Sequence, residues 1–368
     1  MKSIYIHIPF CKQKCLYCDF NSYSGKESLI EEYVIALKKE IQSYNFNEFE
    51  TIYFGGGTPS IIPSNYISDI MSMVHCKGEV TLELNPGTID EKKLLDYKKA
   101  GINRLSIGLQ ATQKTILKEI GRIHTIEEFD KAFKMARKVG FDNINVDLMF
   151  GLPKQTLKDV EESLSYIITL NPEHISCYSL ILHNNIFKNL PSDEEERKMY
   201  YLIMQKLKEA GYEHYEISNF SKPGKQSRHN LCYWNQKEYI GVGPGASSYL
   251  EGKRYTNESD ISRYIEKINL NEKYYEIEEV QNNEDKIKEY MILKLRLLDG
   301  VNVQEAYKKF GINVLEKFEK EIKRMLDKGL LEIVNLSLEE CGQKETSKFL
   351  RLTNKGLDFA NIVWEEFI

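Results

Sequence analysis

The chain has 368 residues, which is long for one average domain and fits a large barrel with a smaller appendage. Its net charge is −5 and its lysines are scattered, so we expect no nucleic-acid partner held mainly by phosphate contacts. No apolar run approaches membrane-spanning length, and seven cysteines without an export signal predict reduced thiols in the cytoplasm rather than a disulfide framework.

The first 220 residues alternate short apolar or β-branched runs with amphipathic helical patterns. The predicted strands cover 3–8, 51–54, 80–84, 104–109, 143–149 and 175–180. The predicted helices cover 29–41, 65–74, 91–100, 127–139, 157–170 and 194–210. Strand–helix repeats predict a parallel sheet with right-handed crossovers. Six repeats are too few to close an eight-stranded barrel, so the predicted fold is α/β with an open, partial (βα)6 barrel.

Several helix ends carry their own signals. Asp90 and Thr125 precede two of the predicted helices and are suitable N-caps, because a short oxygen-bearing side chain can accept from the first free amides. Gly101, Gly140 and Gly211 each follow a predicted helix, where a left-handed residue ends the helix most easily.

After about residue 250 the pattern becomes mainly helical, so we expect two domains, 1–250 and 251–368. The predicted helices cover 259–269, 284–297, 303–310, 314–327 and 354–367, and short strands are expected at 330–334 and 349–352. Between those strands, the polar segment 339–348 is expected to be an exposed loop. Helices followed by a two-stranded wing are typical of a winged-helix module. We do not expect DNA binding, because 314–327 mixes acidic and basic residues about evenly.

Three cysteines, Cys11, Cys15 and Cys18, follow the first predicted strand with the spacing C-x3-C-x2-C. Three thiolates are one ligand short of the four that a cubane iron–sulfur cluster takes, which leaves one iron open for a small molecule. A zinc site completed by His7 is an alternative, although His7 belongs to an extended run and no second C-x-x-C pair follows. Unrelated reduced thiols are the other alternative.

A glycine-rich segment, residues 55–60 (GGGTPS), directly follows the second predicted strand. Glycines there permit positive φ and allow a ligand to approach the backbone closely. The segment lacks the Lys-Ser/Thr of a phosphate loop and the spacing of a dinucleotide-binding turn. It is therefore either a binding loop of another kind or simply a tight strand-to-helix turn.

Polar residues stand at the ends of otherwise apolar predicted strands: Glu83, Gln110 and Asp147. In a strand–helix barrel the carboxyl ends of the strands form the active-site face, so these side chains are expected to converge on one mouth. One acidic residue in a strand is more often a satisfied structural group, but three at equivalent positions favour a binding site. Carboxylates are suited to accept from ribose hydroxyls.

Residues 5–18 (YIHIPFCKQKCLYC) resemble the radical S-adenosylmethionine (SAM) superfamily, and more narrowly its coproporphyrinogen III oxidase-like family of dehydrogenases and heme chaperones. The resemblance extends through residues 145–155 (NVDLMFGLPKQ) to 351–357 and covers nearly the whole chain. It implies that Cys11, Cys15 and Cys18 bind one [4Fe–4S] cluster whose open iron takes SAM. In that superfamily an electron from the cluster cleaves SAM to a 5′-deoxyadenosyl radical, and the protein orients the cofactor and excludes water.

The same resemblance implies a set of residues that contact SAM through its methionyl amino group, its ribose or its adenine, or that line a second SAM site of the dehydrogenase. They are Gly56, Gly57 and Thr58 for the amino group, Glu83 for the ribose, Tyr17 near the adenine, Tyr5 for the cluster-bound SAM, and Gln110, Arg122 and Asp147 for the second site.

Residues 229–234 (HNLCYW) resemble the H-N-x-x-Y-W signature of the heme chaperone subgroup. By this resemblance His229 is a candidate axial ligand of heme iron, with a hydrogen-bonded core histidine as the equally weighted alternative. Cys232 is a soft alternative ligand. Residues 241–246 (GVGPGA) are expected to form an irregular lining loop, because Pro244 does not fit a dinucleotide-binding helix start. The other cysteines are expected to be small buried or surface thiols: Cys76, Cys177 and Cys341.

Departures from the family pattern separate its two subgroups. The dehydrogenase branch carries the motif C-x3-C-x2-C-x-C, whereas this chain has Phe20 at the position of the fourth cysteine. The dehydrogenase also carries a long segment before its Tyr-x-His motif, whereas Tyr5 lies near the start of this chain. Both differences indicate the heme chaperone. A third departure is His183, within 182–185 (LHNN), where relatives usually show a glutamate; its effect on a substrate site is left open.

We therefore expect a cytoplasmic heme chaperone that binds heme, carries one [4Fe–4S] cluster with SAM, and delivers heme to acceptor proteins in solution or at the membrane. The alternative is an oxygen-independent coproporphyrinogen III dehydrogenase, which decarboxylates porphyrinogen propionates in heme biosynthesis by radical SAM chemistry. Whether the chain turns over SAM as an enzyme is left open at this point.

Overall fold

The computed structural model describes residues 2–44, 48–181, 186–340 and 343–368. The chain forms two compact units. The first comprises Met1–Glu213, Ser218–His229 and Glu238–Glu279, and the second comprises His214–Ile217, Asn230–Lys237 and Val280–Ile368. This division differs from the predicted boundary at residue 250, because the segment that follows residue 250 continues the sheet of the first unit.

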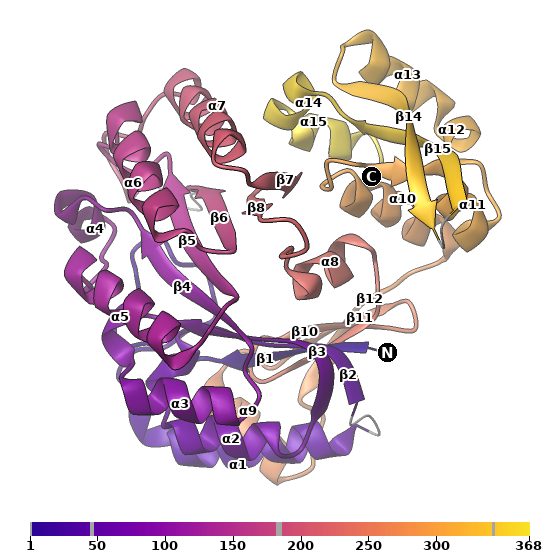
Figure 1. Cartoon of the computed structure of the whole chain (residues 1–368). Helices are drawn as coiled ribbons and strands as arrows, with labels where there is room; N and C mark the ends of the chain where they lie inside the picture. Colours follow the sequence, from indigo (N-terminus) through magenta and orange to yellow (C-terminus); the bar gives the residue numbers. More distant parts are fainter. Residues whose placement is uncertain (1, 45–47, 182–185, 341–342) are drawn as a thin grey trace. The chain divides into compact units, whose positions relative to one another are not determined.

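An open, mainly parallel sheet with outer helices forms the first unit (Figure 1). Its strands lie in the order β12-β11-β10-β9-β1-β2-β3-β4-β5-β6-β8. The strand bounds are β1 Lys2–Ile8, β2 Glu48–Gly56, β3 His75–Leu84, β4 Arg104–Gln110, β5 Ile144–Phe150, β6 His174–Ser179, β8 Asn219–Ser221, β9 Tyr239–Val242, β10 Ser247–Leu250, β11 Lys253–Asn257 and β12 Tyr275–Val280. Adjacent strands from β1 to β6 pair in parallel, which confirms the predicted partial barrel.

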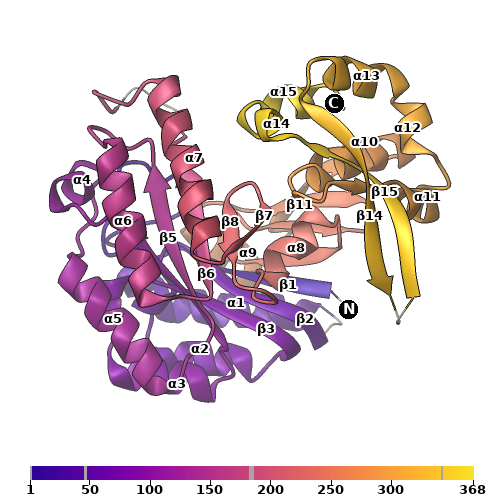
Figure 2. The same ribbon diagram turned by 45° about the horizontal axis from the view of Figure 1, so that its top comes forward.

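Helices connect the parallel strands β1 to β6, as right-handed crossovers require. They are α1 Ile30–Ser43, α2 Ser64–Met71, α3 Glu91–Lys99, α4 Lys114–Glu119, α5 Ile126–Val139 and α6 Leu157–Leu170. α7 Asp193–Glu209 follows β6, α9 Ile261–Asn269 lies between β11 and β12, and α8 Arg228–Trp234 begins in the first unit and ends in the second. Figures 1 and 2 show α2, α3, α5 and α6 on the outer side of the curved sheet. Every residue of β4 is buried, as expected for a central strand of a parallel sheet.

The predicted helix caps are confirmed. The Asp90 side chain accepts from the backbone amide of Lys93, and Thr125 forms a capping box with Glu128. Gly140 ends α5 in the left-handed region with φ +94°, and Gly101 and Gly211 also have positive φ. Six strands and six helices of this unit were predicted to within a few residues, except that β2 and β3 begin earlier.

The far edge of the first unit was not predicted. Residues 241–246 were expected to be irregular, but Gly241 and Val242 belong to β9, which pairs in parallel with β1. A turn then leads into β10, which pairs antiparallel with β9 through Tyr249 and Tyr239. Short, polar strands such as β10 and β11 carry little apolar periodicity, so the sequence pattern alone does not reveal them.

The second unit is mainly helical and carries a small antiparallel sheet in the order β13-β15-β14. Its elements are α10 Asn283–Lys294, β13 Val301–Asn302, α11 Val303–Phe310, α12 Val314–Lys317, α13 Glu319–Asp327, β14 Leu331–Glu340, β15 Gln343–Leu352, α14 Asn354–Asp358 and α15 Ala360–Glu365, and its segment 214–217 contains most of β7, Glu213–Glu216. Helices followed by a two-stranded hairpin confirm the predicted winged-helix-like domain.

Three expectations for the second unit were wrong in detail, one of them because the predicted helix 354–367 is divided at Phe359 into α14 and α15. The segment 339–348 is not simply a loop, because β14 and β15 pair in register up to Glu340 and Gln343. The predicted helix 314–327 is broken at Phe318, a buried residue whose ring meets that of Phe367 edge-on at 5.4 Å. Cys341 lies outside the described residues.

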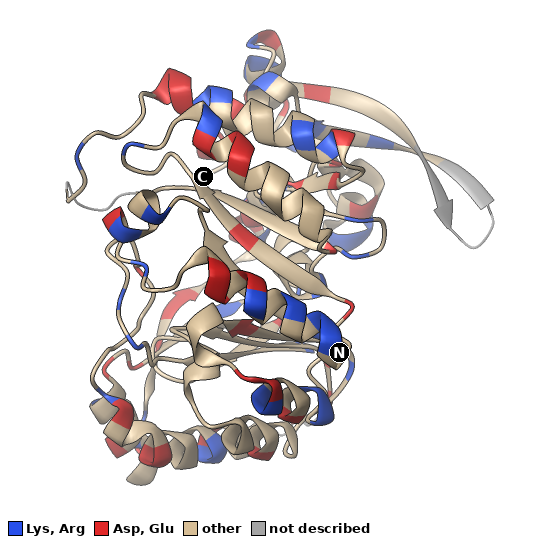
Figure 3. Cartoon of the chain, turned by 60° about the vertical axis from the view of Figure 1, so that its left-hand side comes forward, with Lys and Arg blue, Asp and Glu red and all other residues tan. Residues whose placement is uncertain are grey.

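Acidic and basic residues alternate along the helices drawn in Figure 3. In the part of the chain that the structure describes, no helix is both long and apolar enough to cross a membrane.

Candidate functional site

The three cysteines lie in the loop between β1 and α1. Backbone hydrogen bonds shape this loop: the Cys11 amide donates to the Tyr23 carbonyl (2.8 Å), and the Tyr23 amide donates to the Pro9 carbonyl (2.7 Å). The Cys18 amide donates to the Cys15 carbonyl (3.2 Å) in a tight turn. Cys11 is buried, whereas Cys15 and Cys18 are partly exposed.

The loop supplies three sulfur donors of the kind that an iron–sulfur cluster takes, although burial opposes the ionised form of two of them. Burial raises the pKa of Cys11 and of Cys18, and the charges of the other two cysteines contribute to raising that of Cys18. The Arg122 Nη1 atom donates to Cys15 Sγ over 3.7 Å, so a guanidinium group lies beside this sulfur. Within the described ranges, no group of three or more His, Cys, Asp or Glu side chains is arranged to hold a metal ion. The fit of a cluster therefore depends on the donor set and not on a common metal position.

The structure disfavours a zinc site completed by His7. The His7 Nδ1 atom is hydrogen bonded to the Tyr5 hydroxyl (3.0 Å), and His7 Nε2 is hydrogen bonded to the Asn21 carbonyl (2.7 Å). Both ring nitrogens are thus engaged in buried contacts. His7 acts as a structural support that links β1 to the end of the cysteine loop.

The glycine-rich segment brings β2 against the cysteine loop. The Gly57 amide donates to the Ile8 carbonyl (2.9 Å), and the Thr58 amide donates to the Phe10 carbonyl (2.8 Å). A side chain at Gly57 would place its Cβ 2.7 Å from the Phe10 carbonyl oxygen, so this close approach requires glycine. As a result, Thr58 Oγ1 lies 3.6 Å from Cys11 Sγ. The two predicted ligand-binding segments are therefore adjacent.

Glu83, near the end of β3, faces a pair of tyrosines. Its Oε1 atom accepts from the Tyr53 hydroxyl (2.7 Å), and the rings of Tyr5 and Tyr53 are stacked with centroids 6.1 Å apart. A Cβ at Gly55 would lie within 3.2 Å of all three side chains, which places them around this glycine. Burial raises the pKa of Glu83 to about 7, and the hydrogen bond from Tyr53 opposes part of that rise. A ribose hydroxyl donor would stabilise the ionised form of this carboxylate.

Asp147, in β5, is half-buried, and neighbouring side chains hold it in place. Its carboxylate accepts from the Asn145 side-chain amide (2.7 Å) and from the Ser106 hydroxyl (3.2 Å). Burial raises the pKa of Asp147, while these two hydrogen bonds lower it. The charge of Asp147 also contributes to the raised pKa of Glu83, so the two carboxylates share one region of the sheet.

Gln110 and Arg122 meet above Gly108, the register partner of Asp147. The Arg122 Nη2 atom donates to the Gly108 carbonyl (2.8 Å). A Cβ at Gly108 would lie 2.7 Å from Arg122 Nη2 and 3.0 Å from Gln110 Nε2. Gln110 has φ +71°, a left-handed conformation that is unusual for a residue other than glycine. The structure thus brings Gln110 and Arg122 together beside Gly108, on the strand next to that of Asp147.

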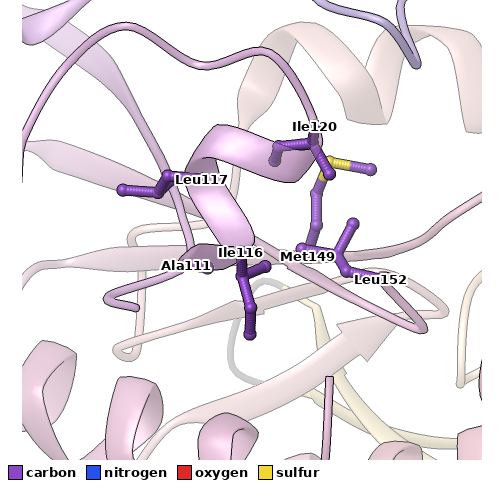
Figure 4. Close-up of a cluster of buried hydrophobic side chains, with 6 residues drawn as sticks. All are labelled: Ala111, Ile116, Leu117, Ile120, Met149 and Leu152. Atoms are coloured by element: carbon purple, nitrogen blue, oxygen red, sulfur yellow. The ribbon is translucent and has the colours of Figure 1, made fainter. Parts of the chain in front are cut away.

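Tyr17 packs against an apolar wall beside the cysteine loop. The wall includes residues of α4 and of the segment that follows β5, and Figure 4 shows its buried side chains. They are Ala111, Ile116, Leu117, Ile120, Met149 and Leu152. Burial raises the pKa of Tyr17, and the charge of Arg122 opposes that effect. This wall therefore gives the Tyr17 ring apolar surroundings.

His229 is a core residue of the first unit. Only 1% of it is exposed, its Nδ1 atom is hydrogen bonded to Thr51 Oγ1 (2.8 Å), and its ring lies 5.1 Å from that of Tyr53. Its backbone amide donates to Glu79 (3.1 Å). Burial lowers the pKa of His229 to about 3. Of the two readings of this histidine, the structure favours the hydrogen-bonded core residue over the heme ligand. His183 lies outside the described residues.

Sequence reasoning missed the residues that hold these side chains in place. Tyr53 contacts Glu83, while Ser106 and Asn145 contact Asp147. Asn145 stands two residues before Asp147 in the same strand, so strand periodicity does place it on the same face. Tyr53 lies in β2, next to the strand of Glu83, and Ser106 lies in β4, next to the strand of Asp147. These contacts between strands follow only from the register of the sheet.

Comparisons with known proteins give the family of the chain. Residues 5–167 match the radical SAM superfamily, and residues 281–342 match the HemN C-terminal domain. A protein from Bacillus subtilis named heme chaperone HemW is 38% identical over 351 residues, which cover 90% of this chain and 93% of that protein. A heme chaperone HemW from Escherichia coli is 33% identical over 100% of this chain and 98% of its own length.

This chain belongs to the HemW family of radical SAM proteins. Membership of the superfamily implies a [4Fe–4S] cluster and SAM as its cofactors. The HemW fold is also that of a solved coproporphyrinogen III oxidase, HemN from Escherichia coli, which superimposes with a TM-score of 0.84. That structure covers 99% of this chain at 21% identity, and 89% of it is covered in turn.

Proposed function

We propose that this chain is a heme chaperone that binds heme, carries one [4Fe–4S] cluster with SAM, and delivers heme to acceptor proteins. The observation that carries the proposal is the full-length similarity to proteins named heme chaperone HemW, at 33–38% identity. Phe20, at the position of the dehydrogenase's fourth cysteine, supports the same choice. We place the protein in the cytoplasm, where thiols stay reduced, with heme-accepting proteins in solution or at the membrane as its partners.

The chain's residues have defined tasks in this proposal. Cys11, Cys15 and Cys18 would hold the cluster, which with SAM at its open iron supplies one-electron chemistry when bound. The glycine segment would offer its backbone to the methionyl group, with Thr58 beside Cys11. Further SAM contacts are proposed for Tyr5, Tyr17, Gly56, Gly57, Glu83, Gln110, Arg122 and Asp147. These residues bind, orient and shield the cofactor from water.

His229 is assigned a supporting role in this proposal. Its burial and its bond to Thr51 leave it fixed behind Tyr53, whose hydroxyl donates to Glu83. We therefore do not propose His229 as the axial ligand of heme. Instead, this histidine stabilises the side of the site that carries Glu83.

The second candidate function is the oxygen-independent dehydrogenation of coproporphyrinogen III. It is favoured by the shared fold with the solved HemN structure, but at 21% identity this similarity supports the fold alone. The missing fourth cysteine argues against it.

An anaerobic assay separates the two functions. Incubation of the reconstituted chain with coproporphyrinogen III, SAM and a reductant is expected to release no more decarboxylated product than the Cys15→Ser variant releases. Product formed by the wild-type chain and lost in Cys15→Ser would instead show that the chain is the enzyme. Product analysis by mass spectrometry decides between the outcomes.

A further inference from the structure

The turn at residues 243–245 packs closely against the cysteine loop, and it has no part in the proposed function. It connects β9 to β10, and both of its glycines have positive φ: +97° for Gly243 and +74° for Gly245. A Cβ at Gly243 would lie 2.7 Å from the His7 carbonyl oxygen, and one at Gly245 would lie 2.7 Å from Asn21 Nδ2. The turn therefore packs against both the end of β1 and the last part of the cysteine loop.

Asn21 fastens the cysteine loop to this turn. Its Nδ2 atom donates to the Pro244 carbonyl (2.9 Å) and to the Ser259 carbonyl (2.8 Å). The Tyr23 hydroxyl donates to the same Ser259 carbonyl (2.8 Å), and the Tyr23 backbone is paired with Cys11 and Pro9. Residues only three to five positions beyond Cys18 are thus tied to segments more than 220 residues away.

A buried carboxylate holds the turn from its other side. Glu40, in α1, is only 1% exposed and accepts from the Gly243 amide (2.8 Å), the Asn257 side-chain amide (2.7 Å) and the Tyr264 hydroxyl. The Asn257 side chain also donates to the Gly243 carbonyl (3.0 Å). An ionised carboxylate only accepts hydrogen bonds, so three donors match it well. Burial raises the pKa of Glu40 to about 7, and these three hydrogen bonds oppose that rise.

We propose that Glu40 and Asn21 are positioning residues for the cluster-binding loop. Glu40 fixes the 243–245 turn, and Asn21 ties the loop to that turn, so the three thiolates are held where a cluster needs them. The inference rests on the proposed function, because it assumes that Cys11, Cys15 and Cys18 bind a cluster. In this proposal the GVGPGA motif connects the buried Glu40 carboxylate to the cysteine loop, because its turn binds Glu40 on one side and Asn21 on the other.

Two variants test the two links separately. Asn21→Ala removes both donors to Pro244 and Ser259. Glu40→Gln keeps the size of the side chain but turns one acceptor into a donor, which faces the Gly243 amide or the Asn257 amide without a partner. Glu32→Gln, on the exposed face of the same helix, is the matched control.

The measurement is iron release from the anaerobically reconstituted chain to a ferrous chelator, with the electron paramagnetic resonance spectrum of the reduced cluster recorded with and without SAM. Asn21→Ala and Glu40→Gln are expected to form the cluster but to release iron about tenfold faster than wild type and Glu32→Gln. The spectral change on adding SAM is expected to be altered in both. The urea midpoint of Asn21→Ala is expected to stay close to that of wild type, because Asn21 is partly exposed.

Iron release and a SAM response in Asn21→Ala that match wild type would overturn the inference, and this variant decides the matter even if Glu40→Gln does not fold. A wild-type chain that forms no cluster at all would overturn the proposed cluster site together with the inference. A stable wild-type cluster with unchanged release from Asn21→Ala would overturn the inference alone.

Discussion

The Cys15→Ser variant is expected to lose the iron–sulfur cluster after anaerobic reconstitution. Cys15 is one of only three thiols in the loop, and the structure places the Arg122 guanidinium against its sulfur. A serine hydroxyl at this position is a far weaker ligand than a thiolate. Two remaining protein thiolates are expected to be too few to bind the cluster stably. Iron and sulfide analysis, together with the absorbance near 400 nm expected of such clusters, measures the loss.

Cys76→Ser is the matched control for this experiment. Cys76 lies outside the loop, where its thiol donates to the Glu50 carbonyl over 3.4 Å, and a serine can keep that hydrogen bond. This variant should retain the full cluster. Full cluster content in Cys15→Ser would contradict the three-cysteine site, whereas loss in both variants would indicate general unfolding.

The Gly57→Ala variant is expected to bind SAM at least about tenfold more weakly, which corresponds to about 1.4 kcal/mol. Gly57 does not have a positive φ, so alanine causes no backbone strain there, and the effect comes from the close approach alone. The added Cβ would lie 2.7 Å from the Phe10 carbonyl and 3.0 Å from the Ile8 carbonyl. Backbone atoms cannot give way cheaply, so β2 must move away from β1 and carry Thr58 away from Cys11.

Calorimetric titration of SAM into the reconstituted variant measures this effect. For the same steric reason, urea unfolding is expected to show that the free energy of unfolding falls by about 1–3 kcal/mol. Gly87→Ala is the control, because its Cβ would meet only Glu128 Oε1, at 3.9 Å. Equal SAM affinity in Gly57→Ala and wild type would show that the glycine segment does not form the SAM site.

Most strands and helices around the site could be predicted from their apolar residues, but the short helix α4, which carries Ile116 and Leu117 of the wall beside Tyr17, was not predicted. β1 to β6 are long runs buried in a parallel sheet, and each is followed by a helix with an apolar face. β9 to β12 were not predicted, because β9 is only four residues long and β11 and β12 are mostly partly exposed or exposed. Their place beside β1 depends on long-range pairing, such as that of Tyr5 with Gly241.

The candidate ligands could also be predicted, since a polar residue such as Glu83 or Asp147 is conspicuous in an apolar strand. What supports them could not be. The contact of Tyr53 with Glu83 joins residues 30 positions apart, and that of Asn21 with Pro244 joins residues 223 apart. The role of His229 was equally inaccessible, because a histidine beside aromatic residues has the same sequence pattern whether its ring is open to a ligand or sealed by Thr51.

Titration of heme into the reconstituted chain, followed by its Soret absorbance, tests the central claim most directly. We expect a saturable spectral change, with the heme then passing to an apo heme protein added in excess. Absence of a saturable change, in a chain that holds its cluster, would contradict the assignment of this protein as a heme chaperone.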